Sequence, residues 1–123
     1  MYNNFDKEVK TKWGNTLSYQ EFDKKSKNYS KEEFDKINKG LMDILKYFSI
    51  FMKSGKEVES KEVQDNVARL QKYITEYYYS CSNEILIGLG QMYVTDERFR
   101  NNIDSNGVGS SEYIKSAIEV YCK

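Results

Sequence analysis

The stretch SKEEFDKINKGLMDILKYFSIFMKSG, residues 30–55, decides the fold class of this 123-residue chain. It begins with Ser30 followed three residues later by Glu33, the pattern of a capping box, and it ends with Ser54-Gly55, a typical helix stop. Between these ends, apolar residues recur every three or four positions, as on one face of a helix. The residues on this face are Phe34, Ile37, Leu41, Ile44, Leu45, Phe48, Phe51 and Met52. The stretch therefore predicts one long amphipathic helix.

Helical periodicity continues along the rest of the chain. Ser60 is expected to cap a second helix, the corner at residues 80–83 to precede a third, Thr95 to start a fourth, and Ser110 or Ser111 to cap a last one. A weaker helical pattern precedes residue 30. No stretch shows the strict alternation of a strand, and the chain has no proline. We therefore expect an all-α domain of about six or seven helices.

The composition is uneven along what we interpret as a single domain, residues 1–123. Residues 1–40 contain 11 apolar and 16 charged residues, whereas residues 41–123 contain 37 apolar residues out of 83. Ordering the backbone opposes folding by roughly 1–2 kcal/mol per residue, and a segment with few apolar side chains offsets little of that. We expect residues 41–123 to form the helical core. Residues 1–40 are expected to form a weakly folded arm together with the start of the first core helix.

Composition also excludes several classes of function. Lysine plus arginine and aspartate plus glutamate number 19 each, so no net charge attracts nucleic acid or an anionic membrane. The absence of histidine excludes haem held by a proximal histidine, His-ligated zinc and Ser-His or Cys-His catalytic pairs. Two cysteines are too few for a metal cluster or a disulfide framework, and they indicate reduced thiols of a cytoplasmic protein. We expect no cofactor and no membrane-spanning segment.

Three features of the core half allow both a structural and a functional interpretation. Cys81 is either a small buried residue at a tight corner or a thiol activated by a helix N-terminus. On one helix, Tyr77, Tyr78 and Tyr79 cannot all face the core, so one of them faces solvent, a cavity or a loop. Gly88 and Gly90 permit either close helix packing or space for a ligand beside the helix.

Candidate acid–base groups are Glu84, Asp96, Glu97 and Arg98, but all four lie in first helical turns, where the helix dipole and surface pairing account for them. The single tryptophan, Trp13, lies in the polar arm. A large apolar side chain on a weakly folded arm suits a segment that clamps onto a partner, although docking onto the core explains it equally well.

Three motifs resemble a known family. Residues 13–16, W-G-N-T, resemble the signature near the start of TipAS-type antibiotic-recognition domains. Residues 79–81 with Glu84 are similar to the Y-D-C…E corner of that family. Residues 89–99 match its L-G-x-M-Y-V-x-D-E-R-F stretch at every fixed position, and the resemblance extends over essentially the whole chain.

The resemblance implies a globin-like helical domain, not an enzyme, that binds large amphipathic peptide antibiotics such as thiopeptides. In the family this domain is the C-terminal effector part of MerR-type transcriptional activators, or a free-standing drug-binding protein. The N-terminal arm of such domains folds over the drug. For this chain the resemblance implies a monomer that contacts neither nucleic acid nor membrane directly, since a separate MerR-type domain would bind DNA.

The sequence departs from the family pattern at the corner. In the family's best-known thiopeptide binder, a cysteine seven residues after the corner cysteine bonds covalently to a dehydroalanine of the drug, and that position is Gly88 here. Ser80 replaces the usual aspartate, and Ile85 stands where methionine is common. The resemblance therefore implies non-covalent capture.

The predicted ligand-binding residues combine the aromatic and apolar positions with the family corner. They are Trp13, Phe48, Met52, Tyr78, Tyr79, Cys81, Glu84, Ile85, Gly88, Leu89, Met92 and Tyr93. Two other functions remain as alternatives: a helical protein–protein adaptor with an aromatic interface, and an enzyme that depends on Cys81 with a lysine or carboxylate as its base.

Overall fold

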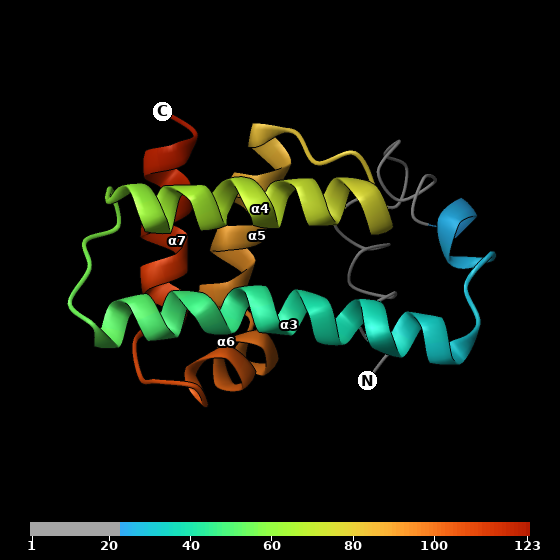
Figure 1. Ribbon diagram of the computed structural model, residues 1–123, viewed down its shortest axis with the longest axis horizontal. Coiled ribbons are helices and arrows are strands. Elements are labelled where there is room, and N and C mark those ends of the chain that lie inside the picture. The colour runs from blue at the N-terminus through green and yellow to red at the C-terminus, as the bar shows by residue number, and fades with distance from the viewer. Residues whose placement is uncertain (1–22) are drawn as a thin grey trace.

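The computed structural model describes residues 23–123, and this part of the chain is helical without any strand. A helical turn at residues 23–26 precedes five helices (Figure 1). They are α3 (Lys31–Lys53), α4 (Lys61–Tyr77), α5 (Asn83–Thr95), α6 (Glu97–Asp104) and α7 (Ser110–Tyr121). The predicted all-α class is confirmed. The weaker helical pattern of the first 22 residues, and Trp13 with it, lies outside the described residues.

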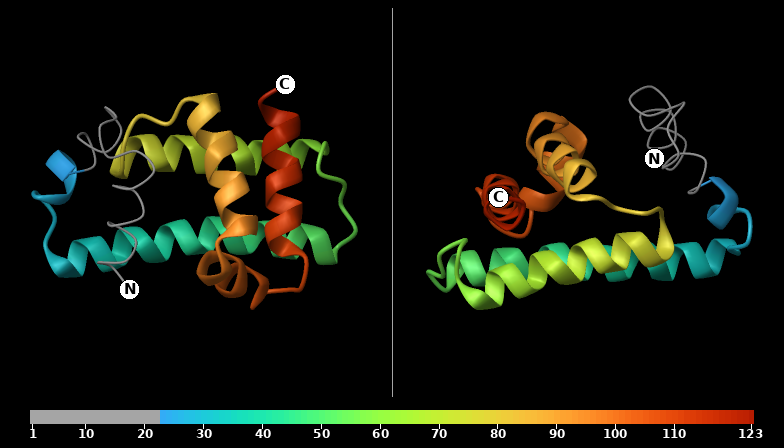
Figure 2. Two further views of the ribbon diagram at one scale, coloured as in Figure 1. Left: turned by 180° about the vertical axis from the view of Figure 1, so that it is seen from behind. Right: turned by 90° about the horizontal axis from the view of Figure 1, so that it is seen from above.

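The helices form two crossed layers. α3 and α4 run antiparallel side by side, and α5 and α7 form a second antiparallel pair that crosses over them (Figure 2). This pair covers the C-terminal part of α3 and the N-terminal part of α4, so the other ends of α3 and α4 extend beyond it. The side chains fully enclosed between the layers are mainly aliphatic. They include Ile44, Leu45, Phe48, Val63, Val67, Leu70, Leu86, Ile103, Ile114 and Ile118.

The two ends of α3 follow the sequence prediction. The Ser30 hydroxyl oxygen accepts a hydrogen bond from the Glu33 backbone N–H at 3.1 Å, which satisfies one unpaired donor of the first turn. The return half of the capping box differs, because the Glu33 carboxylate accepts from the Ser30 hydroxyl at 3.2 Å. At the other end, Ser54 donates to the Ile50 carbonyl at 2.9 Å, and Gly55 adopts the left-handed φ of 80° that glycine tolerates.

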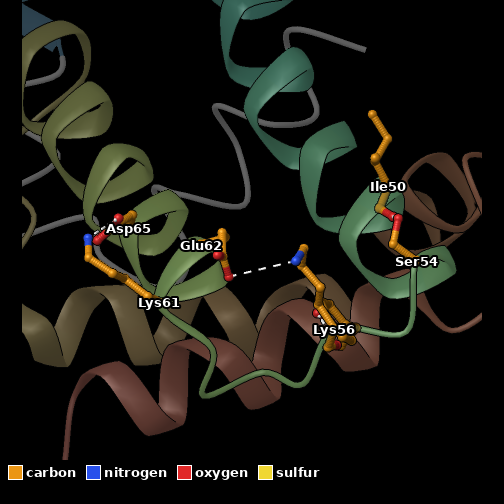
Figure 3. Close-up of polar contacts among 7 residues, drawn as sticks. Ile50, Ser54, Lys56, Lys61, Glu62 and Asp65 are labelled. Carbon is orange, nitrogen blue, oxygen red and sulfur yellow. Dashed lines mark hydrogen bonds and ion pairs between the residues drawn. The ribbon is translucent and has the colours of Figure 1, made fainter.

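The α3–α4 connection is bonded both to the start of α4 and to α7. The ion pairs Lys56–Glu62, at 3.8 Å, and Lys61–Asp65, at 2.8 Å, join exposed side chains (Figure 3), and such pairs contribute little to stability. The stronger constraint comes from Tyr113 of α7, whose hydroxyl donates to the Lys56 carbonyl at 2.7 Å. A hydrogen bond therefore joins the α3–α4 connection to α7, in the second layer.

Two predicted helix starts differ in detail. Ser60 occupies the N-cap position of α4, but its side chain makes no capping bond. Thr95 does not start α6: it ends α5, where its hydroxyl donates to the Gln91 carbonyl at 2.9 Å. The true N-cap of α6 is Asp96, which accepts from the Arg98 backbone N–H at 3.0 Å. The carboxylate of Asp96 therefore caps α6 in place of the predicted Thr95.

The prediction that Ser110 or Ser111 caps α7 is wrong. The N-cap is Gly109, at a left-handed φ of 92°, and both serines are buried in the first turn. The Ser110 hydroxyl pairs with the hydroxyl of Ser49 on α3 at 2.6 Å. The Ser111 backbone N–H donates to the Asp104 carboxylate at 2.9 Å, so a side chain from α6 takes the capping role.

Gly90 sets the distance between α5 and α7. A Cβ atom at this position would lie 3.2 Å from the Ile118 Cδ1 atom and 3.5 Å from the Lys115 Cα atom. These contacts support the packing interpretation of this glycine, because the missing side chain lets the two helices approach closely.

Candidate functional site

The family corner, residues 79–84, begins where α4 ends. α4 stops at Tyr77, and the backbone N–H groups of Tyr78 and Tyr79 both donate to the Ile74 carbonyl, at 2.9 and 3.0 Å. The prediction that the three tyrosines share one helix is therefore wrong. Because the chain turns at Tyr78, both Tyr78 and Tyr79 are buried, and Tyr77 is the half-buried member of the run.

Tyr78 links this corner to the N-terminal half of α3. Its hydroxyl donates to the Asn38 side-chain oxygen at 2.6 Å. Its ring meets the Phe34 ring edge to face, with centroids 6.3 Å apart. A polar and an aromatic contact thus join the corner to the N-terminal half of α3.

Tyr79, Cys81 and Tyr93 form a buried cluster between the corner and α5. Burial raises the pKa of the Tyr79 and Tyr93 phenols well above the usual value of about 10, and the neighbouring Cys81 raises both further. Both phenols are therefore neutral at physiological pH.

Cys81 is a structural residue of the corner, and the activated-thiol interpretation is wrong. Its backbone N–H donates to the Thr75 hydroxyl at 3.1 Å, and its carbonyl accepts from the Gln71 side chain at 2.9 Å. Burial, with the nearby Cys122, raises the pKa of the Cys81 thiol to about 12. The thiolate is the nucleophilic form, so this shift lowers the reactivity of the thiol.

We expect Cys81 to resist thiol reagents in the folded protein. In a Cys122→Ser variant at pH 8, its labelling should be about a thousandfold slower than in the denatured chain, because a pKa near 12 instead of 9 lowers the thiolate fraction by about that factor. The rate should rise with pH. Labelling followed by mass spectrometry, with and without denaturant, measures it. Equal rates in the two states would show that the corner does not bury this thiol.

The predicted residues on α5 lie along one face of the helix. Ile85 and Gly88 are half-buried, Met92 is buried on the same face, and Leu89 is buried beside it. Glu84 is exposed in the first turn, where a carboxylate is favoured by the helix dipole. α5 begins within the corner, and its Tyr93 lies close to Tyr79 and Cys81; the joint role of these residues in one binding site stays a prediction.

Three predicted residues lie elsewhere. Phe48 is fully enclosed in the core between the layers. Met52 lies near the C-terminal end of α3, where its side chain approaches Gly107 and Gly109 in the α6–α7 loop, at the opposite end of the layer from the corner (Figure 1). Trp13 lies outside the described residues. The role of these residues in ligand binding stays a prediction.

The candidate acid–base residues are not gathered into a site. Glu84, Glu97 and Arg98 are exposed, and Asp96 serves as the N-cap of α6 and pairs with Arg98 at 3.3 Å. Among residues 23–123, no group of three or more acidic or thiol side chains is arranged to hold a metal ion. In the same part of the chain, no helix is long and apolar enough to cross a bilayer.

Sequence reasoning missed two polar residues that build the corner. Asn38 accepts a hydrogen bond from the Tyr78 hydroxyl. Gln71 donates to the Cys81 carbonyl and to the Asn83 side-chain oxygen, both at 2.9 Å. The Tyr121 hydroxyl of α7 in turn donates to Gln71 at 3.1 Å. Their signal was present in the sequence, because both are polar residues beside an apolar helical stripe.

The comparisons with known proteins agree with this geometry. The family profile of the TipAS antibiotic-recognition domain matches residues 5–121. The chain belongs to the TipAS family. The resemblance drawn from the three motifs is therefore confirmed.

Relatives of this TipAS domain are transcriptional activators. The chain is 32% identical over 114 residues to the HTH-type transcriptional activator TipA of Streptomyces coelicolor, covering 93% of this chain and 45% of TipA. It is 31% identical over 115 residues to the HTH-type transcriptional activator mta of Bacillus subtilis, covering 94% of this chain and 44% of mta. The chain thus spans less than half the length of these curated relatives.

A solved TipAS structure has the same fold. The structure of TipAS from Streptomyces lividans in complex with nosiheptide, from a thiopeptide antibiotic resistance system, matches with a TM-score of 0.85 and 31% identity. The match covers 98% of this chain and 84% of that one. The helical architecture expected from the sequence is therefore that of a TipAS domain.

Proposed function

We propose that this chain binds large amphipathic peptide antibiotics of the thiopeptide class, without covalent capture and without catalysis. The observation that carries the proposal is the match over 98% of the chain to a domain solved with nosiheptide. The composition of the site supports it, because buried tyrosines and a methionine beside a half-buried helix face suit a large heteroaromatic ligand.

We place the binding surface at the corner and the adjoining faces of α3 and α5. Apolar contact with Ile85, Leu89 and Met92 would supply most of the affinity, at about 25 cal/mol per Å² of apolar surface buried. The phenols of Tyr78 and Tyr79 would meet polar groups of the ligand. Ordering of the arm subtracts from this affinity, since immobilising a segment opposes binding.

The N-terminal arm is the second part of the proposal. We infer that residues of the arm cover the bound antibiotic, with Trp13 as an apolar anchor. Lys25 and Tyr29, in the last part of the predicted arm, contact the end of α4.

We propose a regulatory role from the relatives. As the drug-sensing part of a MerR-type activator, or as a free-standing domain that sequesters antibiotic, the chain would act as a monomer in the cytoplasm and would contact neither DNA nor membrane itself. The activators it resembles are about twice its length, so a DNA-binding part would belong to a longer protein.

Nosiheptide should raise the melting temperature of this protein. At 100 times its dissociation constant, a ligand that binds only the folded state stabilises that state by about 2.7 kcal/mol. Differential scanning fluorimetry over a nosiheptide series measures the shift, which should grow with the logarithm of the free concentration. The solvent carrier alone is the control. No shift up to the solubility limit of nosiheptide would contradict the proposed function.

A further inference from the structure

The backbone of the corner is held at Cys81 by two side chains of α4. The Thr75 hydroxyl accepts a hydrogen bond from the Cys81 N–H at 3.1 Å, and the Gln71 amide nitrogen donates to the Cys81 carbonyl at 2.9 Å. Gln71 and Thr75 are four residues apart, so they are neighbours on the same face of α4. Both backbone polar groups of Cys81 are therefore paired with the helix that precedes the corner.

Gln71 also contacts two further helices. Its amide nitrogen donates to the side chain of Asn83, in the first turn of α5, at 2.9 Å. Its amide oxygen accepts from the hydroxyl of Tyr121, at the end of α7, at 3.1 Å. The Cys81 carbonyl can only accept a hydrogen bond, so it fixes which end of the amide faces the corner. One side chain thus joins α4, the corner, α5 and α7.

These contacts lie between two parts of the candidate site. Tyr79, which is buried, precedes Cys81 by two residues. α5 begins two residues after Cys81 and carries Ile85 on its half-buried face. The path of the chain from Tyr79 into α5 therefore depends on how the backbone at Cys81 is held. A change of conformation there would move Tyr79 relative to Ile85.

We propose that Gln71 and Thr75 are positioning residues for antibiotic binding, which hold the backbone at Cys81 and so fix the placement of Tyr79 relative to the half-buried face of α5. The inference rests on the proposed function. Neither side chain is required to touch the antibiotic. They keep the corner in one conformation before the ligand arrives, and a protein that already populates its binding conformation has a higher apparent affinity.

The test uses substitutions of similar size that remove only the hydrogen-bonding groups. Gln71→Met removes the amide and keeps a side chain of about the same length. Thr75→Val removes the hydroxyl and keeps the branched shape. If Gln71→Met does not fold, Thr75→Val carries the test alone, because it breaks a different bond to the same residue of the corner.

The chain offers a matched control for each substitution. Gln64→Met is the glutamine control, because the Gln64 amide also donates to two backbone carbonyls, those of Val58 and Ala117, near the other end of α4. Thr95→Val is the threonine control, because the Thr95 hydroxyl donates to the Gln91 carbonyl of its own helix.

Two measurements, made in a Cys122→Ser parent, separate positioning from a general loss of stability. The rate at which a thiol reagent labels Cys81 reports how firmly the corner is held, without any antibiotic. Nosiheptide titration reports binding. Gln71→Met and Thr75→Val should each weaken nosiheptide binding roughly fivefold, as expected for the net loss of one hydrogen bond, and should accelerate Cys81 labelling by a similar factor. The two controls should match the parent in both measurements, even where they lower the melting temperature equally.

Each contrary outcome has a distinct meaning. Unchanged Cys81 labelling in the Gln71 and Thr75 variants would show that these bonds do not hold the corner, and would overturn the proposal. Faster labelling with unchanged nosiheptide affinity would overturn the positioning role and leave the proposed function intact. An equal loss of affinity in Gln64→Met would show that binding follows overall stability, which also overturns the role. Failure of the parent to bind nosiheptide would overturn the proposed function and, with it, this role.

Discussion

Replacing Phe48 by alanine should lower the free energy of unfolding by about 3–5 kcal/mol, the range for removing a buried aromatic side chain from a packed core. Phe48 is 0% exposed and lies on α3 beneath the crossing pair of helices. The loss combines the apolar surface returned to water with the cavity that the surrounding side chains fill only in part. Urea denaturation followed by circular dichroism measures it.

Tyr47 provides the matched control for this substitution. It is the neighbouring aromatic residue on the same helix, but it is 44% exposed and lies under the Arg69 guanidinium, 5.5 Å from the ring centroid. Tyr47→Ala should lower stability by less than about 1 kcal/mol. Equal effects at the two positions would contradict the assignment of Phe48 to the core.

A milder variant decides whether Phe48 also lines the antibiotic site. Phe48→Leu keeps an apolar side chain in the core and should leave the protein folded. If Phe48 is only a core residue, nosiheptide should bind this variant as it binds the unmodified protein. A tenfold loss of affinity in a folded Phe48→Leu variant would return Phe48 to the ligand site.

The second large effect concerns covalent capture. The unmodified protein should release nosiheptide completely on denaturation, and Gly88→Cys should produce a stable adduct. Gly88, where the resemblance to the family's thiopeptide binder implies a trapping cysteine, is half-buried on α5. A thiolate placed there would add to a dehydroalanine of the drug, provided that the two atoms approach to about 3–3.5 Å. Intact-mass spectra after denaturation distinguish no adduct from one adduct per chain.

The native thiols supply the control. Cys81 is buried with a pKa of about 12, so it should not compete for the drug. Gly88→Cys combined with Cys81→Ser and Cys122→Ser should still form the adduct. An adduct on the unmodified chain that maps to Cys81 would show that the antibiotic sits differently from the proposed position.

Local sequence patterns were enough to predict the helical class and both ends of α3. The N-cap of α3 at Ser30 and its end at Ser54 depend on contacts between residues that are close in sequence. Both lie where the sequence pattern predicts them. The start of α7 could not be found in this way. Asp104, from the preceding helix, accepts from the Ser111 backbone N–H, and Ser49, from α3, pairs with the Ser110 hydroxyl, and the sequence around residue 110 reveals neither contact.

The sequence was enough to predict which residues belong to the candidate site, but not which side chains hold them in place. The motif residues from Tyr78 to Tyr93 indicated the corner and the α5 face. Two of the side chains that hold them, Asn38 and Gln71, act through hydrogen bonds that span 40 and 10 residues of sequence. Such contacts depend on how helices are placed in space, which periodicity along a single segment does not determine.

Gly90 limits which substitutions α5 tolerates. The face of α5 that carries Gly90 packs against α7: a Cβ there would require the end of the Ile118 side chain to shift by a few tenths of an ångström, and a larger side chain would require the two helices to move apart. Ile85 and Gly88 lie on a half-buried face, where substitutions are expected to be less damaging. Sequence changes in α5 should therefore be tolerated more readily at Ile85 and Gly88 than at Gly90.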